Sequence, residues 1–114
     1  MDVCRLDSAH GDPGALAACA ARVRQAALAW PERTVAVLLD VDCADLCSGR
    51  SRTWSGMNPE VLDFLALGRV SSASEVRMAR KALGPSSHRL RLLAKIEGES
   101  GLRSFDEILE ESDG

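Results

Sequence analysis

Residues 90–114 read LRLLAKIEGESGLRSFDEILEESDG, and this stretch decides the fold class of the chain. It begins with a mostly apolar run of strand length. Gly98 and Gly101 then indicate a short loop. Ser104 stands three residues before Glu107, which is the spacing of a capping box at the start of a helix. The buried stripe of this helix is expected to contain Phe105, Ile108 and Leu109. The stretch is therefore a strand–loop–helix unit.

Lys95 and Glu97 lie at the end of the predicted strand. Residues two apart in a strand point to the same face, so a cation and a carboxylate would lie side by side. Active sites of α/β sheets lie at the carboxyl ends of strands, which makes the pair a candidate for catalysis. An ion pair without a catalytic role is the alternative, because perturbed charge pairs also occur in structural networks.

Two further helices have recognisable start signals. Asp12 as N-cap and Pro13 at the first helical position predict a helix that runs to about residue 29. Ser72 and Glu75 form a second capping box, and the helix that they begin is expected to end near Gly84.

Apolar runs of strand length separate these helices. Strands are predicted at residues 3–6, 34–39, 64–70 and 90–96. Residues 44–57 have no clear periodicity and are expected to form a loop, and Pro59 is expected to begin a short helical turn before the third strand. Strands that alternate with helices in this order predict a parallel sheet with right-handed crossovers.

Length and charge narrow the class of protein. The chain has 114 residues, enough for one modest domain, and a net charge of −3. This weakly acidic balance argues against nucleic-acid binding, which requires a basic face. No apolar run reaches about 18 residues and no leader is apparent, so we expect no membrane span and a cytoplasmic location.

The four cysteines are expected to be reduced. Cys4, Cys19, Cys43 and Cys47 are sparsely spaced, and nothing in the sequence indicates an oxidising compartment. Cys43, Cys47 and His10 could be imagined as a zinc site, but C-x₃-C without a second pair is a weak signal. Buried or incidental thiols are the favoured interpretation.

Three segments together resemble one enzyme family. AKIEGESGLRSFDEILEESDG, at residues 94–114, is similar to the part of pyruvate kinase whose usual form is close to KIEN-x-EG-x-x-x-FDEIL-x-x-SDG. MDVCRLDSAHG, at residues 1–11, is similar to MNVARLNFSHG, and VAVLLDVDCADLCSG, at residues 35–49, is similar to VAIALDTKGPEIRTG. The segments follow the family's order, so the resemblance covers nearly the whole chain.

The resemblance implies a fold and a reaction. Residues 1–114 would be an incomplete barrel domain, a partial (β/α)8 TIM barrel with about four parallel strands that correspond to the family's second to fifth strands. Residues 44–57 would be the loop where the family inserts its lid domain. Pyruvate kinases transfer a phosphoryl group from phosphoenolpyruvate to ADP in glycolysis, giving pyruvate and ATP, and they use Mg²⁺ and K⁺.

The resemblance also assigns ligand positions for the substrates. Lys95 matches the catalytic lysine beside the transferred phosphoryl group, Arg5 the arginine that meets the substrate's phosphate, and His10 a position near the nucleotide. Each position has a structural alternative: Arg5 could simply pair with Asp40 on the neighbouring strand, and His10 could be a turn residue.

Metal positions follow from the same resemblance. Glu97 matches the magnesium-binding glutamate, and one or two carboxylates suit Mg²⁺ because it keeps most of its waters. Asp40 matches a potassium ligand. Asp7 occupies a second potassium position, where the family has an asparagine.

Several departures from the family predict that the isolated chain has little or no activity. Ala9 replaces a serine that binds potassium, Asp42 replaces a lysine, and Cys47 replaces an arginine of the active site. The lid domain is absent, and the family's second magnesium carboxylate would follow Gly114. Two alternatives stay open: a catalytically dead fragment that binds full-length subunits or a second copy of itself, and an unstable truncated product.

Overall fold

The computed structural model describes residues 1–114, apart from the side chain of His10. Its centre is a sheet of four parallel strands in the order β1-β2-β3-β4. The strands are β1 (Asp2–Asp7), β2 (Val35–Asp42), β3 (Phe64–Gly68) and β4 (Arg91–Ala94). The prediction of about four parallel strands that alternate with helices, as in part of a TIM barrel, is confirmed.

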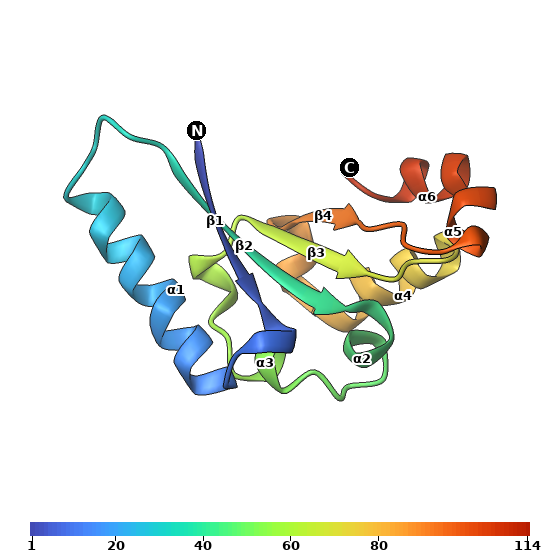
Figure 1. The fold of residues 1–114 in the computed structure, drawn as a ribbon, viewed down its shortest axis with the longest axis horizontal. Helices are drawn as coiled ribbons and strands as arrows, with labels where there is room; N and C mark the ends of the chain where they lie inside the picture. The colour runs from blue at the N-terminus through green and yellow to red at the C-terminus, as the bar shows by residue number, and fades with distance from the viewer.

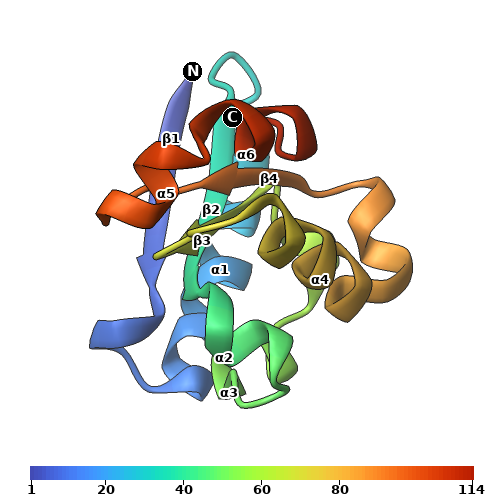
Figure 2. The ribbon, with the colours of Figure 1, turned by 90° about the vertical axis from the view of Figure 1, so that its right-hand side faces the viewer.

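Six helices connect or follow the strands (Figure 1). They are α1 (Pro13–Leu28), α2 (Cys43–Cys47), α3 (Arg52–Ser55), α4 (Ala73–Leu83), α5 (Glu99–Arg103) and α6 (Phe105–Glu111). Short 3₁₀ turns cover Ser8–His10, Pro59–Val61 and Gly84–His88. The long helices α1 and α4 lie at different parts of the sheet, with α6 near α4 (Figures 1 and 2). No helix in the described part of the chain has the length and apolar character needed to cross a membrane.

The predicted helix starts are found in the structure. The Asp12 carboxylate accepts a hydrogen bond from the Ala15 N–H at 3.1 Å, and Ser72 Oγ accepts one from the Glu75 N–H. Glu75 reaches back to the N–H and hydroxyl of Ser71, at 2.8 Å each. These bonds satisfy N–H groups that a helix start would leave unpaired.

The two faces of the sheet differ in what covers them. Alternate strand residues pack under the helices in one apolar cluster, which includes Leu6, Val37, Leu39, Val41, Leu65, Leu67 and Leu92 with Ala20, Val76, Ala79, Leu83 and Ile108. The opposite face carries Val3, Leu38, Phe64 and Leu93, which stay partly or largely exposed and lie outside this cluster. The second face would be the inside of a closed barrel.

Two arginine–aspartate ion pairs stabilise the amino ends of strands. Asp63 accepts the Val37 N–H at 2.8 Å and is paired with Arg24 of α1 at 2.6 Å. Asp113 accepts the Leu92 N–H at 2.9 Å and is paired with Arg80 of α4 at 3.2 Å. In both cases a helix arginine holds an aspartate, and the aspartate continues the ladder of the neighbouring strand.

Residues 44–57 contain helices rather than the single loop that the sequence predicts. Asp42 caps α2 by accepting the Asp45 N–H at 3.1 Å, and Ser51 caps α3 by accepting the Trp54 N–H at 3.2 Å. Helices this short show no hydrophobic period, so their caps were the only available signal.

The strand–loop–helix unit at residues 90–114 also differs in detail. Gly101 lies inside α5 rather than in a loop, and Ser104 makes no side-chain cap for α6. Ile108 is buried as expected, whereas Phe105 and Leu109 are largely exposed. The cause is α5, which occupies the residues before Ser104 and removes the extended entry that a capping box requires.

Candidate functional site

Asp40 is the centre of a charged cluster at the carboxyl end of the sheet. Its side chain is only 7% exposed, and it points away from the face that carries Leu39 and Val41. Oδ2 of Asp40 accepts hydrogen bonds from Arg5 Nη2 at 2.6 Å, Arg5 Nε at 3.2 Å and Lys95 Nζ at 2.9 Å. One carboxylate oxygen thus joins a cation from β1 to a cation beyond β4.

Small residues on β3 allow Lys95 to reach across that strand. Asp40 is opposite Ala66 in the parallel register, and Asp42 is opposite Gly68. A methyl group and a hydrogen leave the space above β3 free for the long lysine side chain. The Lys95 side chain is 37% exposed, so it lies along the surface of the sheet and can meet a ligand.

Glu97 borders the same space. A Cβ atom built on Gly68 would lie 3.6 Å from Glu97 Oε2 and 3.9 Å from Asp40 Oδ1. Glu97 is held there by the Arg69 N–H, which donates to Oε2 at 2.8 Å. The two carboxylates therefore lie on either side of the position where Gly68 lacks a side chain.

Arg69 is a residue that sequence reasoning missed. Its φ of 58° lies in the left-handed region, which is costly for a residue with a Cβ, by about 1 kcal/mol. Its guanidinium pairs with Asp42, and that hydrogen bond raises the pKa of Arg69. Burial pushes the pKa of Asp42 upward, but the bonds from Arg69 and from the Asp45 N–H outweigh it and leave the pKa lowered. A glycine followed by a long polar residue at a strand end was the available signal.

The structure brings together most of the residues that the sequence singled out. Arg5, Asp40, Lys95 and Glu97 form one cluster, although β4 ends at Ala94, so that Lys95 and Glu97 lie just beyond the strand rather than in it. The alternative in which Arg5 and Asp40 pair across neighbouring strands is observed. This pairing raises the pKa of Arg5, chiefly through the hydrogen bond.

The remaining two predicted positions stand at the same end of β1. Asp7 is opposite Asp40 in the register, accepts the Ala9 N–H at 2.9 Å and lies 3.6 Å from Arg5 Nη2. The side chain of His10 lies outside the described residues, so its nucleotide-binding role stays a prediction.

The charge of the cluster determines what it can bind. Two cations, Arg5 and Lys95, face three carboxylates, those of Asp7, Asp40 and Glu97. As arranged, the cations are already paired, so an anionic phosphate would gain little from them. A divalent cation at the carboxylates would change this balance in favour of phosphate.

The donor set fits Mg²⁺ better than K⁺. Glu97 Oε2 accepts one hydrogen bond from the Arg69 N–H, and Mg²⁺ needs only one or two carboxylates beside its waters. Asp40 already carries two cations on one oxygen, so a potassium ion there would meet like charge from Arg5 and Lys95. Among the described residues, no group of three or more His, Cys, Asp or Glu side chains is placed to hold a metal alone.

Comparison with known proteins identifies the family. The sequence profile of the pyruvate kinase barrel domain matches residues 50–114, which is more than half of the chain. The chain belongs to the pyruvate kinase family. Human pyruvate kinase PKLR is 45% identical over 53 residues, which are 46% of this chain and 9% of that protein. The cytosolic isozyme of Solanum tuberosum is 42% identical over 55 residues, which are 48% and 11%. The enzyme of Eimeria tenella is 43% identical over 56 residues, which are 49% and 10%.

The matched part spans only about a tenth of these pyruvate kinases. It contains Gly68, Lys95 and Glu97, whereas Arg5 and Asp40 lie before the profile match. The profile match therefore includes the Lys95–Glu97 side of the cluster and does not include the β1 and β2 side. The two sides are joined by the hydrogen bond from Lys95 to Asp40.

Proposed function

We propose that this chain carries one side of a pyruvate kinase-type phosphoryl-transfer site. The observation that supports it is the convergence of Lys95, Arg5 and Glu97 around Asp40 and Gly68 at the carboxyl end of the sheet. The substrates would be phosphoenolpyruvate and ADP, with ATP and pyruvate as products, as in glycolysis. Cytosolic isozymes are among the relatives, which supports a cytosolic location.

In this proposal each residue has one task. Lys95 places its ammonium beside the phosphoryl group in transfer, where it offsets the charge on the oxygens. Arg5 orients the phosphate through its fork of N–H donors. Glu97 would hold Mg²⁺, which when bound would supply positive charge beside the phosphate. Gly68 keeps open the space in which the phosphate and the carboxylate meet.

We expect little turnover from the 114-residue chain alone. Lys95 and Arg5 both donate to Asp40, so substrate must compete with a buried carboxylate for them. Cys47 stands where the family pattern has an arginine, and Asp42 where it has a lysine. Two cations that would face the substrate are thus replaced by a neutral and a negative residue.

A coupled assay with phosphoenolpyruvate, ADP and Mg²⁺ tests this expectation. Residual turnover should be far below the range of about 1–100 per second that kinases reach, and Lys95→Met should abolish it. Ordinary kinase rates would contradict the expected low activity. Residual turnover that survives Lys95→Met would contradict the proposed role of Lys95.

Binding can be tested without turnover. Mg²⁺ together with phosphoenolpyruvate should raise the Tm of the protein, because a ligand that binds only the folded state stabilises it. Glu97→Gln should remove the increase, and Glu99→Gln, a matched change on exposed α5, should keep it. A shift that persists in Glu97→Gln would place the metal elsewhere.

A second candidate function rests on the uncovered face of the sheet. Val3 is 55% exposed, and Leu38, Phe64 and Leu93 are partly exposed on the same side. We propose that this face can pack against complementary barrel strands, either of a full-length pyruvate kinase subunit or of a second copy. Co-purification with a complete subunit should be weakened by Val3→Asp. It should be unaffected by Leu28→Asp, which changes an exposed residue of α1 on the helix side.

A further inference from the structure

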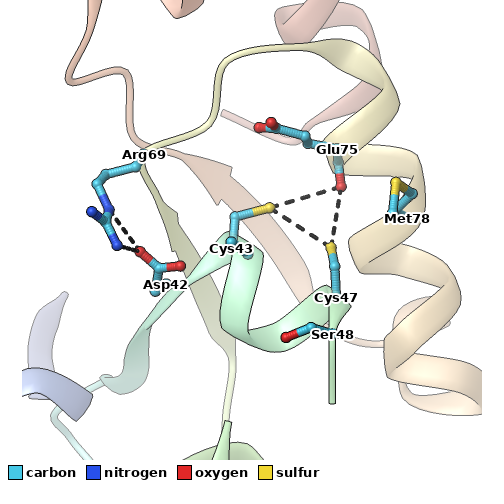
Figure 3. A pocket seen from close by; sticks show the side chains of 8 residues that line it. Asp42, Cys43, Cys47, Ser48, Arg69, Glu75 and Met78 are labelled. Atoms are coloured by element: carbon cyan, nitrogen blue, oxygen red, sulfur yellow. Dashed lines mark hydrogen bonds and ion pairs between the residues drawn. The ribbon is translucent and has the colours of Figure 1, made fainter. Parts of the chain in front are cut away.

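A sulfur-rich pocket lies between α2 and α4, apart from the cluster around Asp40 (Figure 3). Asp42, Cys43, Cys47, Arg69, Glu75 and Met78 are among the residues that line it. We propose that Cys43, Cys47 and Met78 form a site for a soft metal ion of low coordination number, Cu(I).

The two thiols are already placed for a shared ligand. Cys43 and Cys47 are the first and last residues of α2, so their side chains lie one above the other on one face of a single helical turn. Their Sγ atoms are 4.0 Å apart, and each lies 3.8 Å from the carbonyl oxygen of Glu75. Two metal–sulfur bonds of about 2.3 Å that meet at about 120° would span this separation. An ion could therefore bind between them with little movement of the helix.

A disulfide fits the same pair less well. It needs Cβ atoms about 3.8 Å apart, whereas residues four apart on a helix have Cβ atoms at about 5–6 Å. Closing the bond would therefore distort α2, the helix that Asp42 caps. A metal ion that bridges the two thiols would leave the helix and its cap unchanged.

The third donor and the surroundings favour a soft ion. Met78 is 52% exposed on α4 and lines the same pocket, so its thioether can turn toward the thiols (Figure 3). Thiolate and thioether ligands favour soft ions, and Cu(I) is one of them. Zinc would require further nitrogen, oxygen or sulfur ligands, and no third His, Cys, Asp or Glu completes the set within the described residues.

Binding must displace two protons. Burial, with further contributions from Cys47, Glu75 and Asp42, raises the pKa of Cys43 to about 12, and burial also raises the pKa of Cys47. Both thiols are therefore protonated at neutral pH in the metal-free protein. One Cu(I) ion releases both protons and leaves one net negative charge on the metal–thiolate group. Affinity should therefore rise with pH.

The test is an anaerobic Cu(I) titration of the reduced protein against a chromophoric Cu(I) chelator. The wild type should withdraw one equivalent from the chelator. Cys47→Ser should lower the affinity at least about 100-fold, because loss of outer-sphere partners alone costs 10–100-fold. Met78→Leu should cause a smaller loss. The double variant Cys4→Ser/Cys19→Ser is the matched control and should bind as the wild type does.

Two outcomes would overturn the proposal. One is stoichiometric binding that persists in both Cys47→Ser and Cys43→Ser, and the other is binding lost in the Cys4/Cys19 control. Circular dichroism melts establish that each variant is folded. X-ray absorption at the copper edge provides an independent reading: two or three sulfur neighbours at about 2.3 Å support the site, and a shell of only nitrogen or oxygen refutes it.

Discussion

At the scale of single residues, Asp40 organises the cluster. The pairing of Arg5 with Asp40 could be predicted, because both lie near the ends of adjacent parallel strands in a register that the apolar pattern suggests. The contact of Lys95 with Asp40 could not be predicted. It depends on the end of β4 at Ala94 and on the small residues Ala66 and Gly68 of β3. Such a contact is visible only once the register of three strands is known.

Replacement of Asp40 should cost more than replacement of either cation. Asp40→Asn leaves Arg5 and Lys95 close together without their shared anion, and we expect a loss of about 1–3 kcal/mol in the free energy of unfolding. Lys95→Met should cost less, because Arg5 still satisfies Asp40. Urea unfolding followed by circular dichroism compares the two. A larger loss for Lys95→Met would mean that Asp40 is not the centre of the cluster.

Asp113 should make stability depend on acid. The hydrogen bond from the Leu92 N–H, followed by that from Arg80, lowers the pKa of Asp113 in the folded protein. The stability that the ionised Asp113 contributes is therefore complete above the pKa of an aspartate in the unfolded chain, about 3.9. It is lost as the pH falls through the lower pKa of the folded protein. The stability difference between wild type and Asp113→Asn should be constant from neutral pH to about pH 5 and shrink in more acidic solution.

The matched control for this measurement is Asp106→Asn, which changes an exposed carboxylate on α6. Thermal melts of the three proteins over a pH series provide the comparison. A difference between wild type and Asp113→Asn that grows toward acid would have the wrong sign for a lowered pKa.

At the scale of elements, the long helices could be predicted and the short ones could not. The helices α1 and α4 have caps, length and period, whereas α2, α3 and α5 are four or five residues long and are set by tertiary contacts. Helix α5 shows why. An added Cβ at Gly101 would overlap the carbonyl oxygen of Val70, so this turn of helix depends on contact with the segment after β3.

Gly101→Ala should therefore destabilise the protein by about 1–3 kcal/mol, the range for overpacking. Gly98→Ala is its control, since a Cβ there meets nothing within 4 Å and Gly98 has a φ of −136°. Denaturant midpoints measure both. Equal effects of the two changes would show that α5 does not press on Val70.

At the scale of the whole molecule, the family and the parallel sheet followed from sequence because several segments agreed in type and order. The exposed face of the sheet and the pairing of Asp40 with two cations could be seen only in the structure. A cooperative thermal transition would exclude the alternative of an unstable product.

We expect the folded protein to be indifferent to potassium. Arg5 and Lys95 already place two positive charges at Asp40 Oδ2, so a K⁺ ion bound at this carboxylate would be repelled by both. Exchange of potassium chloride for choline chloride at constant ionic strength should leave the Tm unchanged. A rise that is specific to K⁺ would show that one of the two cations gives way to the metal.

The order of strands in the sheet has a consequence for folding kinetics. Because β1, β2, β3 and β4 are neighbours in space in the order of the chain, each pairing requires only one crossover to close. The average sequence separation of contacts is then small for a parallel sheet, and folding should be correspondingly fast. The inner strands β2 and β3 are held on both sides, so opening should begin at the edges. Amide hydrogens of β2 and β3 should then exchange last.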